Sequence, residues 1–381
     1  MTWPTAALGD VATIDRRGVD PRSLPGDTLY VGLEHIERGG RIVGRQTVEE
    51  AQLASAKFAF DDSHVLFGKL RPNLGKVARP TFGGVCSTDI LPIRPGGRLD
   101  RGFLHHFLKQ PSMVDFAASR TTGANLPRLS PATLASFEIP LPSLEEQRRI
   151  AAILDTVDAL HAMRAQADAH FDDLTQSIFS SMFDGESFPE TPLGEIVDPS
   201  DRINYGVVQP GDHVEDGVPL IRVSDLRGGH VDRSNLKRIS REIETKYSRS
   251  RIRGNEVLIS CVGSIGVVAI ATSDDIGANV ARAVTRVPIS DDSLRLYVAA
   301  VLSSARVQRY FRNELRTVSQ PTLNGKQIAE TAIPVPPAAM IKQFALRLES
   351  IQPLRWSIDK SSHGLDELRE SLTAKAFGGQ L

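Results

Sequence analysis

Residues 139–155 read IPLPSLEEQRRIAAILD, and this stretch contains the start of a long helix. Its Pro-rich lead disfavours helical backbone, so the helix is expected to begin only after it. Ser143, followed three residues later by Glu146, has the spacing of an N-terminal capping box. Between Ser143 and Asp184 there is no proline or glycine. We therefore predict one continuous helix, roughly 60 Å long at about 1.5 Å per residue.

The same pattern occurs twice in the chain. Five residues around the junction recur 194 positions later, and the pairs are Leu129 with Leu323, Leu134 with Ile328, Ile139 with Ile333, Pro140 with Pro334 and Pro142 with Pro336. Further upstream, LGDV at 8–11 is echoed by LGEI at 193–196. A long internal repeat indicates two copies of one structural unit. We predict a first domain at 1–142, a long helix at 143–188, a second domain at 189–336 and a second long helix at 337–381.

Apolar residues seven positions apart predict that the two helices pack through a coiled-coil seam. The predicted seam consists of Ile150, Val157, Leu160, Phe171, Leu174 and Ile178 in the first helix and of Phe344, Ile351, Ile358, Leu365 and Leu372 in the second. A single stripe is also typical of an ordinary helix that faces a core. Two matching stripes favour antiparallel pairing, with one domain at each end of the helices. Pro353 and Gly364 predict a kink in the second helix.

The two domains have the sequence pattern of mixed structure. Short β-branched or aromatic runs, such as 64–67 and 257–259, are separated by Gly, Pro, Asn and Asp, which predicts many short strands. One short helix is expected near 103–119 and another near 293–315. The glycine cluster at 263–266 lies between two strand-like runs, which favours a hairpin turn over a phosphate-binding loop. The predicted fold class is α+β, with two mixed, strand-rich domains, two long antiparallel coiled-coil helices and internal two-fold pseudo-symmetry.

Composition narrows the class of protein further. The chain has 381 residues, of which 41% are hydrophobic, enough for two or three domain cores. No apolar run approaches about 18 residues and the N-terminus lacks a signal-peptide pattern, so we expect a cytoplasmic protein that does not contact a membrane. We interpret Cys86 and Cys261 as buried, reduced side chains. The chain has no phosphate-binding loop, zinc-binding pair or recognisable catalytic motif, so no catalytic residue and no metal site are predicted.

Charge is unevenly distributed, although the net charge is only −1. Residues 143–188 carry nine acidic side chains against three basic ones. Residues 67–128 carry ten basic against three acidic side chains, and residues 227–253 carry nine against three. Such basic segments are typical of nucleic-acid-binding surfaces, although an ordinary solvated face uses the same residues. The acidic first helix favours a surface that faces protein.

The junction at 139–155 closely resembles the boundary between recognition domain and helix in the DNA specificity subunits of type I restriction-modification systems. Two further segments, VLFGKLRPNLGKV at 65–77 and VLISCVGSIG at 257–266, look like the strand-turn-strand part of such domains. The openings at 8–11 and 193–196 are also similar, so the resemblance covers essentially the whole chain. The second junction departs from the pattern, because its IPVP is followed by PAAM at 337–340 without the Glu-Glu-Gln.

The resemblance implies a subunit without enzymatic activity of its own. Such a subunit binds double-stranded DNA at a bipartite, interrupted site, with one half read by each target-recognition domain. Its helices dock two copies of an adenine methyltransferase subunit, and a restriction subunit with translocase activity can join the complex. S-adenosylmethionine then belongs to the methyltransferase partner, and this chain needs no cofactor.

The basic segments and predicted turns indicate which side chains contact DNA. Phosphate contacts need cations, and base contacts need polar groups on loops that a rigid scaffold holds. The candidates are Lys69, Arg71, Asn73, Lys76 and Arg128 in the first domain and Arg249, Arg251, Arg253, Ser264, Gln320 and Asn324 in the second. An ordinary surface role uses the same residue types.

Two other classes of function stay open on the residues alone. The first is a single-chain nuclease or methyltransferase, against which the missing motifs argue. The second is a protein-only scaffold or adaptor that organises two identical partners without reading DNA. A DNA affinity that falls strongly with rising salt discriminates the specificity subunit from the adaptor.

Overall fold

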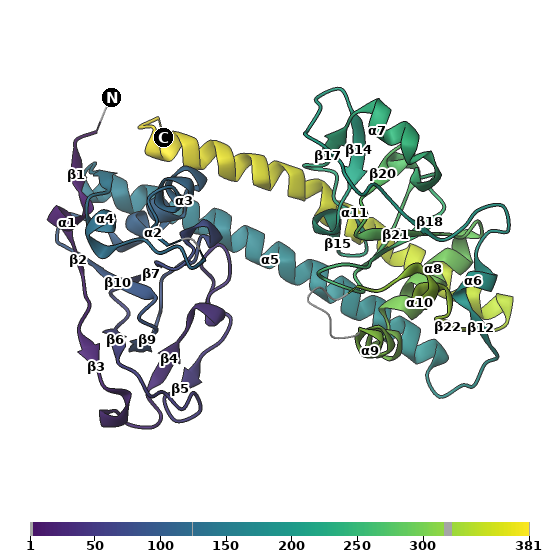
Figure 1. The fold of residues 1–381 in the computed structure, drawn as a ribbon, viewed down its shortest axis with the longest axis horizontal. Coiled ribbons are helices and arrows are strands. Elements are labelled where there is room, and N and C mark those ends of the chain that lie inside the picture. The colour runs from purple at the N-terminus through teal and green to yellow at the C-terminus, as the bar shows by residue number, and fades with distance from the viewer. Residues whose placement is uncertain (1–2, 124, 316–321, 381) are drawn as a thin grey trace. The chain divides into compact units, whose positions relative to one another are not determined.

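The computed structural model describes residues 3–123, 125–315 and 322–380, which divide into two compact units (Figure 1). Unit 1 comprises Met1–Ala162 together with Gly364–Leu381, and unit 2 comprises Met163–His363. The two long helices are α5 (Leu144–Phe183) and α11 (Ala338–Phe377). Each unit therefore contains the beginning of one long helix and the end of the other.

Unit 1 is built mainly from short strands. Its strands are β1 (Thr5–Ala7), β2 (Ala12–Ile14), β3 (Gly18–Val19), β4 (Leu29–Val31), β5 (Gln46–Thr47), β6 (Lys57–Phe60), β7 (Val65–Gly68), β8 (Val77–Ala78), β9 (Gly84–Cys86), β10 (Ile90–Pro95) and β11 (Glu138–Pro140). Its short helices are α1 (Leu8–Val11), α2 (Arg101–Lys109), α3 (Pro111–Ala118) and α4 (Pro131–Ala135). The strands form three sheets, in the orders β1-β11, β2-β10-β7-β8 and β3-β6-β9-β4-β5.

Unit 2 repeats this construction. Its strands are β12 (Glu190–Pro192), β13 (Asn204–Tyr205), β14 (Val218–Ile221), β15 (Leu226–Arg227), β16 (His230–Val231), β17 (Lys237–Ile239), β18 (Glu256–Ser260), β19 (Val268–Ile270), β20 (Asn279–Val280), β21 (Val284–Pro288) and β22 (Ala332–Pro334). Its short helices are α6 (Leu193–Ile196), α7 (Arg241–Lys246), α8 (Asp292–Ser303), α9 (Ala305–Glu314) and α10 (Gly325–Ala329). The sheets have the orders β12-β22, β13-β21-β18-β19, β17-β14-β20 and β15-β16.

The central four-stranded sheet is the same in both units. In unit 1, β10 pairs antiparallel with both β2 and β7, and in unit 2, β21 pairs antiparallel with both β13 and β18. The middle strands β7 and β18 are buried along their length, which suits their β-branched and aromatic residues. The predicted hairpin at 263–266 is confirmed, because β18 and β19 pair antiparallel on either side of it. The internal repeat is thus a repeat of strand order.

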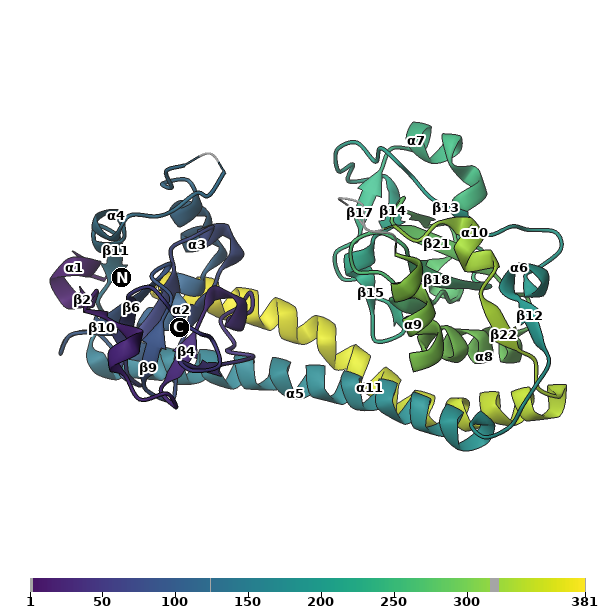
Figure 2. The ribbon, with the colours of Figure 1, turned by 60° about the horizontal axis from the view of Figure 1, so that its bottom comes forward.

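Each predicted short helix of a domain is two helices. In unit 1, Pro111 occupies the first turn of α3, because a proline is tolerated there but cannot continue α2. In unit 2, Ser304 separates α8 from α9, and its side chain caps α9 by accepting a hydrogen bond from the Val307 backbone. The α2 and α8 helices pack against the central sheets, and Figure 2 shows α8 between its sheet and the neighbouring long helices.

Polar side chains help to attach α5 to unit 1. The fully buried Gln147 side chain accepts a hydrogen bond from the Asp100 backbone at 2.8 Å and donates to the carbonyls of Arg98 and Pro142. About three turns further along α5, Asp158 pairs with Lys109 of α2 at 2.7 Å. Burial lowers the pKa of Lys109, and Asp158 opposes that shift. The start of α5 is therefore held to α2 by specific polar contacts.

The end of α11 joins the same attachment. Arg369 lies 3.4 Å from Asp158, and the Phe377 ring packs between the rings of Phe103 and Phe107 of α2. Ala376 is fully buried in the unit 1 core. The start of α5 and the end of α11 therefore lie together, which is the antiparallel relation within this unit.

We expect Asp158→Asn to destabilise unit 1 at pH 7 but not in acid. Burial by itself raises the pKa of Asp158, but Lys109 and Arg369 lower the pKa more, so it lies below its ordinary value. A lowered folded pKa stabilises the protein above the unfolded value of about 3.9, and this stabilisation is lost as the pH falls through the folded value. The stability difference between variant and wild type should therefore shrink below about pH 4.

Urea unfolding followed by circular dichroism at several pH values measures this difference. Asp115→Asn, at an exposed position of α3, is the matched control and should have little effect at any pH. A difference for Asp158→Asn that stays constant down to about pH 3 would contradict the assignment.

The attachment in unit 2 is aromatic. Phe183 at the end of α5 lies 5.1 Å from Tyr297 of α8 and 5.6 Å from Phe344 of α11, measured between ring centroids. Burial raises the pKa of Tyr297, whose hydroxyl donates to the Pro334 carbonyl at 2.9 Å. Ile341 stands 194 residues after Gln147 and is buried in the core. The buried Gln of the first junction is therefore replaced by a buried apolar residue in the second.

The predicted seam residues differ in burial, and the contact of the two helices along the whole seam stays a prediction. Ile150, Val157 and Phe344 are buried, and the partly buried members are Phe171, Ile178, Ile351, Leu365 and Leu372. Leu160 and Leu174 are instead 39% and 42% exposed, so that part of the prediction is wrong. The flank of α5 one residue later mixes polar and apolar side chains. Leu154 on it is buried, and His161 and Thr175 are partly buried. The side chain of Ile358 lies outside the described residues.

A kink is predicted at Pro353 and Gly364. Helix α11 runs through both positions from Ala338 to Phe377, and the kink itself stays a prediction. A single proline removes one backbone hydrogen bond, which need not terminate a helix whose two ends are packed into domain cores.

Candidate nucleic-acid interface

The turn at 69–76 joins β7 to β8 and presents Arg71 to solvent. Arg71 adopts a left-handed backbone with φ of +50°, and among the described residues only Gln52 shares a positive φ without being glycine. This conformation is held by a hydrogen bond from the Arg71 backbone to the Pro127 carbonyl at 2.8 Å. Residues in such sparsely populated conformations concentrate at functional sites. The fold therefore maintains an unfavourable backbone geometry at an exposed arginine.

The loop at 122–128 is joined to this turn. Thr122 and Arg128 exchange backbone hydrogen bonds at 3.0 and 2.9 Å, and Leu129 donates to the Lys69 carbonyl at 2.9 Å. The pairing makes one surface of two segments that are about fifty residues apart in the sequence. Leu74 and Leu126 are exposed large apolar side chains in these segments. Cations beside exposed apolar groups suit a surface that contacts both phosphates and base edges.

The five candidates of the first domain differ in how free their charges are. Among the described residues, no acidic group lies within ion-pair distance of Lys69 or Arg71, and Asn73 is exposed. Arg128 pairs with Asp89 at 2.9 Å, and this hydrogen bond raises its pKa. Lys76 donates to the Leu33 carbonyl at 2.7 Å and is partly buried. Lys69, Arg71 and Asn73 are thus available to a ligand, whereas Lys76 supports the fold.

Unit 2 has the equivalent surface. Leu323 donates to the Cys261 carbonyl at 2.9 Å, as Leu129 does to Lys69 in unit 1. This contact joins the exposed Ser264 turn after β18 to the segment before α10. Asn324 lies there as well, but its side chain caps α10 by accepting from the Gln327 backbone at 3.0 Å. Gln320 lies outside the described residues.

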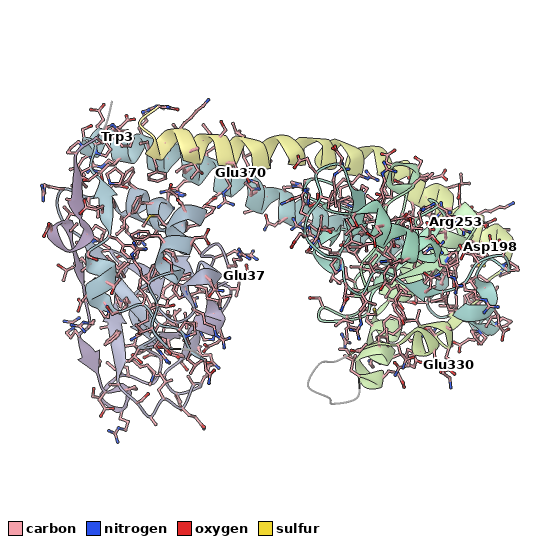
Figure 3. The ribbon with its side chains drawn as sticks, turned by 45° about the horizontal axis from the view of Figure 1, so that its top comes forward. Trp3, Glu37, Asp198, Arg253, Glu330 and Glu370 are labelled. Carbon is pink, nitrogen blue, oxygen red and sulfur yellow. The ribbon has the colours of Figure 1, made fainter. Side chains whose placement is uncertain are left out.

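The three arginine candidates of the second domain lie elsewhere. Arg249, Arg251 and Arg253 precede β18, whereas Ser264 follows it, and a five-residue strand separates the two groups by about 16 Å. Arg251 pairs with buried Glu244 at 2.7 Å, and Arg253 pairs with Asp201 at 3.0 Å. Hydrogen bonds from Ser290 and Ser200, with a smaller contribution from Arg253, lower the pKa of nearby Asp198 to about 2 (Figure 3). Arg251 and Arg253 therefore belong to ion pairs within the fold. Arg249 is exposed and has no ion pair among the described residues.

Two arginines were missed by the sequence analysis. Arg282 is exposed and directly precedes Ala283, whose carbonyl accepts from the Cys261 backbone at 2.8 Å. It lies beside the Ser264 turn because β21 runs antiparallel to β18. In unit 1, Arg120 lies over the Phe116 ring at 3.4 Å, directly before the 122–128 loop. Arg282 can be placed beside this turn only when the pairing of β18 with β21 is known.

The described residues offer little sign of other kinds of site. No group of three or more potential metal ligands occurs there. The described helices include none that is both long and apolar enough to cross a membrane. Cys86 and Cys261 are buried and free, as predicted. The candidate functional site therefore consists of two surfaces, which we call the joined-loop surfaces. One is formed by the 69–76 turn and the 122–128 loop of unit 1, and the other by the Ser264 turn and the segment before α10 in unit 2.

The fold and these surfaces define a protein with two equivalent domains, each of which presents paired loops at one end of a central sheet. The chain matches the model of a family described as Type I restriction modification DNA specificity domain, over residues 1–167 and 201–352. The chain belongs to this family.

Relatives of this chain carry the same description. It is 31% identical over 317 residues to the Type I restriction enzyme EcoBI specificity subunit of Escherichia coli, which covers 74% of this chain and 66% of that protein. It is 31% identical over 189 residues to the EcoDI specificity subunit of Escherichia coli, which covers 48% of this chain and 42% of that protein. These alignments span less than two thirds of either relative.

The fold is also known from a crystal structure. The S subunit of a type I restriction-modification system from M. genitalium is similar with a TM-score of 0.55 and 16% identity, covering 99% of this chain and 96% of that chain. At this identity the similarity concerns the fold alone.

Proposed function

We propose that this chain is the DNA sequence-specificity subunit of a type I restriction-modification complex and that it acts in the cytoplasm. Each unit reads one half of a bipartite, interrupted site in double-stranded DNA. The observation that carries the proposal is the repeat of one joined-loop surface in two units of the same strand order. Two readers related by a two-fold axis bind half-sites on the two sides of an unread gap.

The proposal assigns no catalysis to the chain. Its described residues offer surfaces for contact with DNA and protein. Methyl transfer belongs to an adenine methyltransferase partner, which also binds S-adenosylmethionine. A restriction subunit with translocase activity can join the same complex.

The long helices are proposed to dock two methyltransferase subunits. Several large apolar side chains are exposed along them, namely Leu160, Met163, Leu174, Leu346 and Leu368. The segment 143–188 is acidic, which disfavours contact with DNA phosphates and favours contact with protein. Two copies are proposed because the attachment of the long helices occurs once in each unit.

Exchange of one domain tests the proposal. When residues 1–142 are replaced by the corresponding domain of another family member, one half-site of the methylated DNA motif should change and the other should stay the same. The reason is that the loops of each unit are held by that unit's own sheet. Sequencing of methylated adenines in cells that express the chimaera with its methyltransferase measures both halves at once.

The reciprocal exchange of residues 189–336 is the matched control and should change only the other half-site. Simultaneous change of both half-sites in either chimaera would contradict the model of two independent readers. Complete methylation without any change of motif would mean that the domains do not read DNA and would favour a protein-only adaptor.

A further inference from the structure

Both units contain a short hairpin with an Arg-Gly-Gly tip. In unit 1 residues 36–42 read IERGGRI, and Ile36 bridges Ile42 across the hairpin. In unit 2 residues 226–231 read LRGGHV, and β15 pairs with β16. The tip glycines have positive φ in both cases, +92° and +91° at 39–40 and +51° and +75° at 228–229. Only glycine adopts such turns without strain, so the hairpins are formed by the same local chemistry.

Each hairpin is fixed against the strand pair that carries the candidate DNA-contacting turn. We call this turn, 69–76 in unit 1 and 263–266 in unit 2, the reading turn. In unit 1, the Gly39 backbone donates to the Gly75 carbonyl at 3.3 Å. A Cβ atom added to Gly40 would stand 1.7 Å from the Val77 carbonyl oxygen, so only glycine fits this approach. In unit 2, the Ile270 backbone donates to the Gly229 carbonyl at 2.9 Å. The unit 1 hairpin is therefore a rigid extension of its candidate interface. The unit 2 hairpin is fixed to the end of β19 away from the Ser264 turn, because Ile270 pairs with Val257.

The tips carry exposed cations. Arg38 is exposed, and no acidic group among the described residues lies within ion-pair distance of it. Arg227 is 68% exposed and lies 3.4 Å from Asp232. Figure 3 shows Glu37, the residue before Arg38, at the rim of unit 1. An arginine at the tip of a rigid turn loses little conformational freedom in its backbone when it binds an anion.

The hairpin and the reading turn of unit 1 lie close together. The Gly39 backbone contacts Gly75 at one end of the 3-10 turn Pro72–Leu74, and Arg71 stands at the other end. Four residue steps at about 2 Å each separate these two backbone positions by about 8 Å. Arg38 and Arg71 are therefore carried by neighbouring segments of one surface.

We propose that the Arg-Gly-Gly hairpin of unit 1 is a phosphate clamp, in which Arg38 holds the DNA backbone beside the half-site that unit 1 reads. This inference rests on the proposed function. The clamp fixes the position of the reader on the duplex and carries no sequence information, which is the role of phosphate contacts in DNA recognition. The partner of Arg38 is the DNA backbone because its hairpin is hydrogen-bonded to the turn that presents Arg71. The unit 2 hairpin is placed differently, since its tip contacts Ile270 of β19 and lines a pocket with Phe171 and Gln176 of α5.

The full chain in complex with its methyltransferase provides the test. Fluorescence anisotropy measures its affinity for a duplex that contains the methylated motif and for one that does not, across a range of salt concentrations. Arg38→Ala should weaken binding to both duplexes by the same factor and reduce the slope of log affinity against log salt by about 0.9. The advantage of wild type over variant should therefore fall about 3.5-fold between about 50 and about 200 mM salt.

Three further variants define the result. Arg38→Lys should restore the slope, because it keeps the charge. Arg227→Ala should leave the slope unchanged, because the unit 2 hairpin lies at the end of β19 away from the Ser264 turn. Arg22→Ala is the matched control, since Arg22 is 78% exposed and pairs only with Asp20 at 2.8 Å among the described residues, so affinity and slope should not change.

Each outcome decides between the models. An unchanged affinity and slope for Arg38→Ala overturns the clamp and leaves the proposed function intact, provided that wild type binds DNA. A wild-type complex without salt-dependent DNA binding overturns both. Loss of binding to the motif duplex alone makes Arg38 a base-reading residue, and loss of the methyltransferase places the hairpin in a protein interface. Both of these results overturn the clamp.

Discussion

Phe344→Ala is expected to lower the free energy of unfolding of unit 2 by about 3–5 kcal/mol. The ring is fully buried and contacts Phe179 and Phe183 of α5 and Tyr297 of α8. Its removal leaves a cavity at the point where both long helices meet the domain, and rigid aromatic neighbours cannot collapse to fill it. Amide hydrogen exchange of α8 peptides, measured against urea concentration, reports this local stability.

Leu346→Ala is the matched control on the same helix. Leu346 is 64% exposed, so its truncation should change stability by less than about 0.5 kcal/mol. Equal effects of the two substitutions would show that the aromatic cluster does not hold α11 to unit 2. The polar attachment of unit 1 should be unaffected by either variant.

Arg286→Met is expected to destabilise unit 2 to a similar extent, by about 3–5 kcal/mol. The guanidinium is fully buried between Asp201 at 2.6 Å and Glu256 at 2.7 Å. Burial by itself lowers the pKa of Arg286, but hydrogen bonds with both carboxylates outweigh burial and raise it. Methionine fills a similar volume and leaves two carboxylates without their shared cation. Urea unfolding followed by hydrogen exchange in β18 and β21 measures the loss.

Arg253→Met separates burial from pairing. Arg253 pairs with the same Asp201 at 3.0 Å but its side chain is 56% exposed, so its loss should cost at most about 1 kcal/mol. If the two arginine variants destabilised the protein equally, the cost would come from the Asp201 pair and not from the buried charges.

The start of α5 was well predicted because the hydrogen bonds that form it join residues close together in the sequence. Ser143 accepts a hydrogen bond from the Glu146 backbone at 3.2 Å, as its spacing indicated. In a complete capping box the Glu146 carboxylate also accepts a hydrogen bond from the Ser143 backbone. Here the Glu146 carboxylate instead accepts a hydrogen bond from the Arg149 guanidinium at 2.7 Å. Glu146 and Arg149 lie within one helical turn, so their spacing in the sequence already indicates this ion pair.

The flank of the seam was predicted less well for a physical reason. A search for apolar residues selected Leu160 and Leu174, which are exposed. The helix instead turns Gln147, His161 and Thr175 toward the interior. Polar residues occupy buried positions only where partners satisfy them, and the partners of Gln147 come from segments that precede α5. A hydrophobic period alone does not contain that information.

One part of the candidate interface was predicted from the sequence and another part was not. The turns after β7 and β18 were placed correctly from sequence, since strand-turn-strand order is local. The arginines at 249–253 were grouped with Ser264 by charge, but a strand separates them, and two of them have acidic partners in the structure. Arg282 joins the Ser264 turn only through antiparallel pairing of β18 with β21. Long-range pairing therefore decides which cations share a surface.

The sequence by itself determined that this protein consists of two copies of one unit, that each copy ends in a long helix, and that the family is that of the DNA specificity subunits. The first two conclusions rest on repeats, proline positions and helical periods, which are properties of the chain order. The third rests on the resemblance of the segments at 139–155, 65–77 and 257–266 to that family. Tertiary structure alone decided that an ion pair of Lys109 with Asp158 joins α5 to unit 1, and that Phe183 and Phe344 pack together in unit 2. It also brought the Arg-Gly-Gly tip of unit 1 beside its reading turn. The reason is that such contacts join residues far apart in sequence, and their energies depend on burial, which the order of residues does not specify.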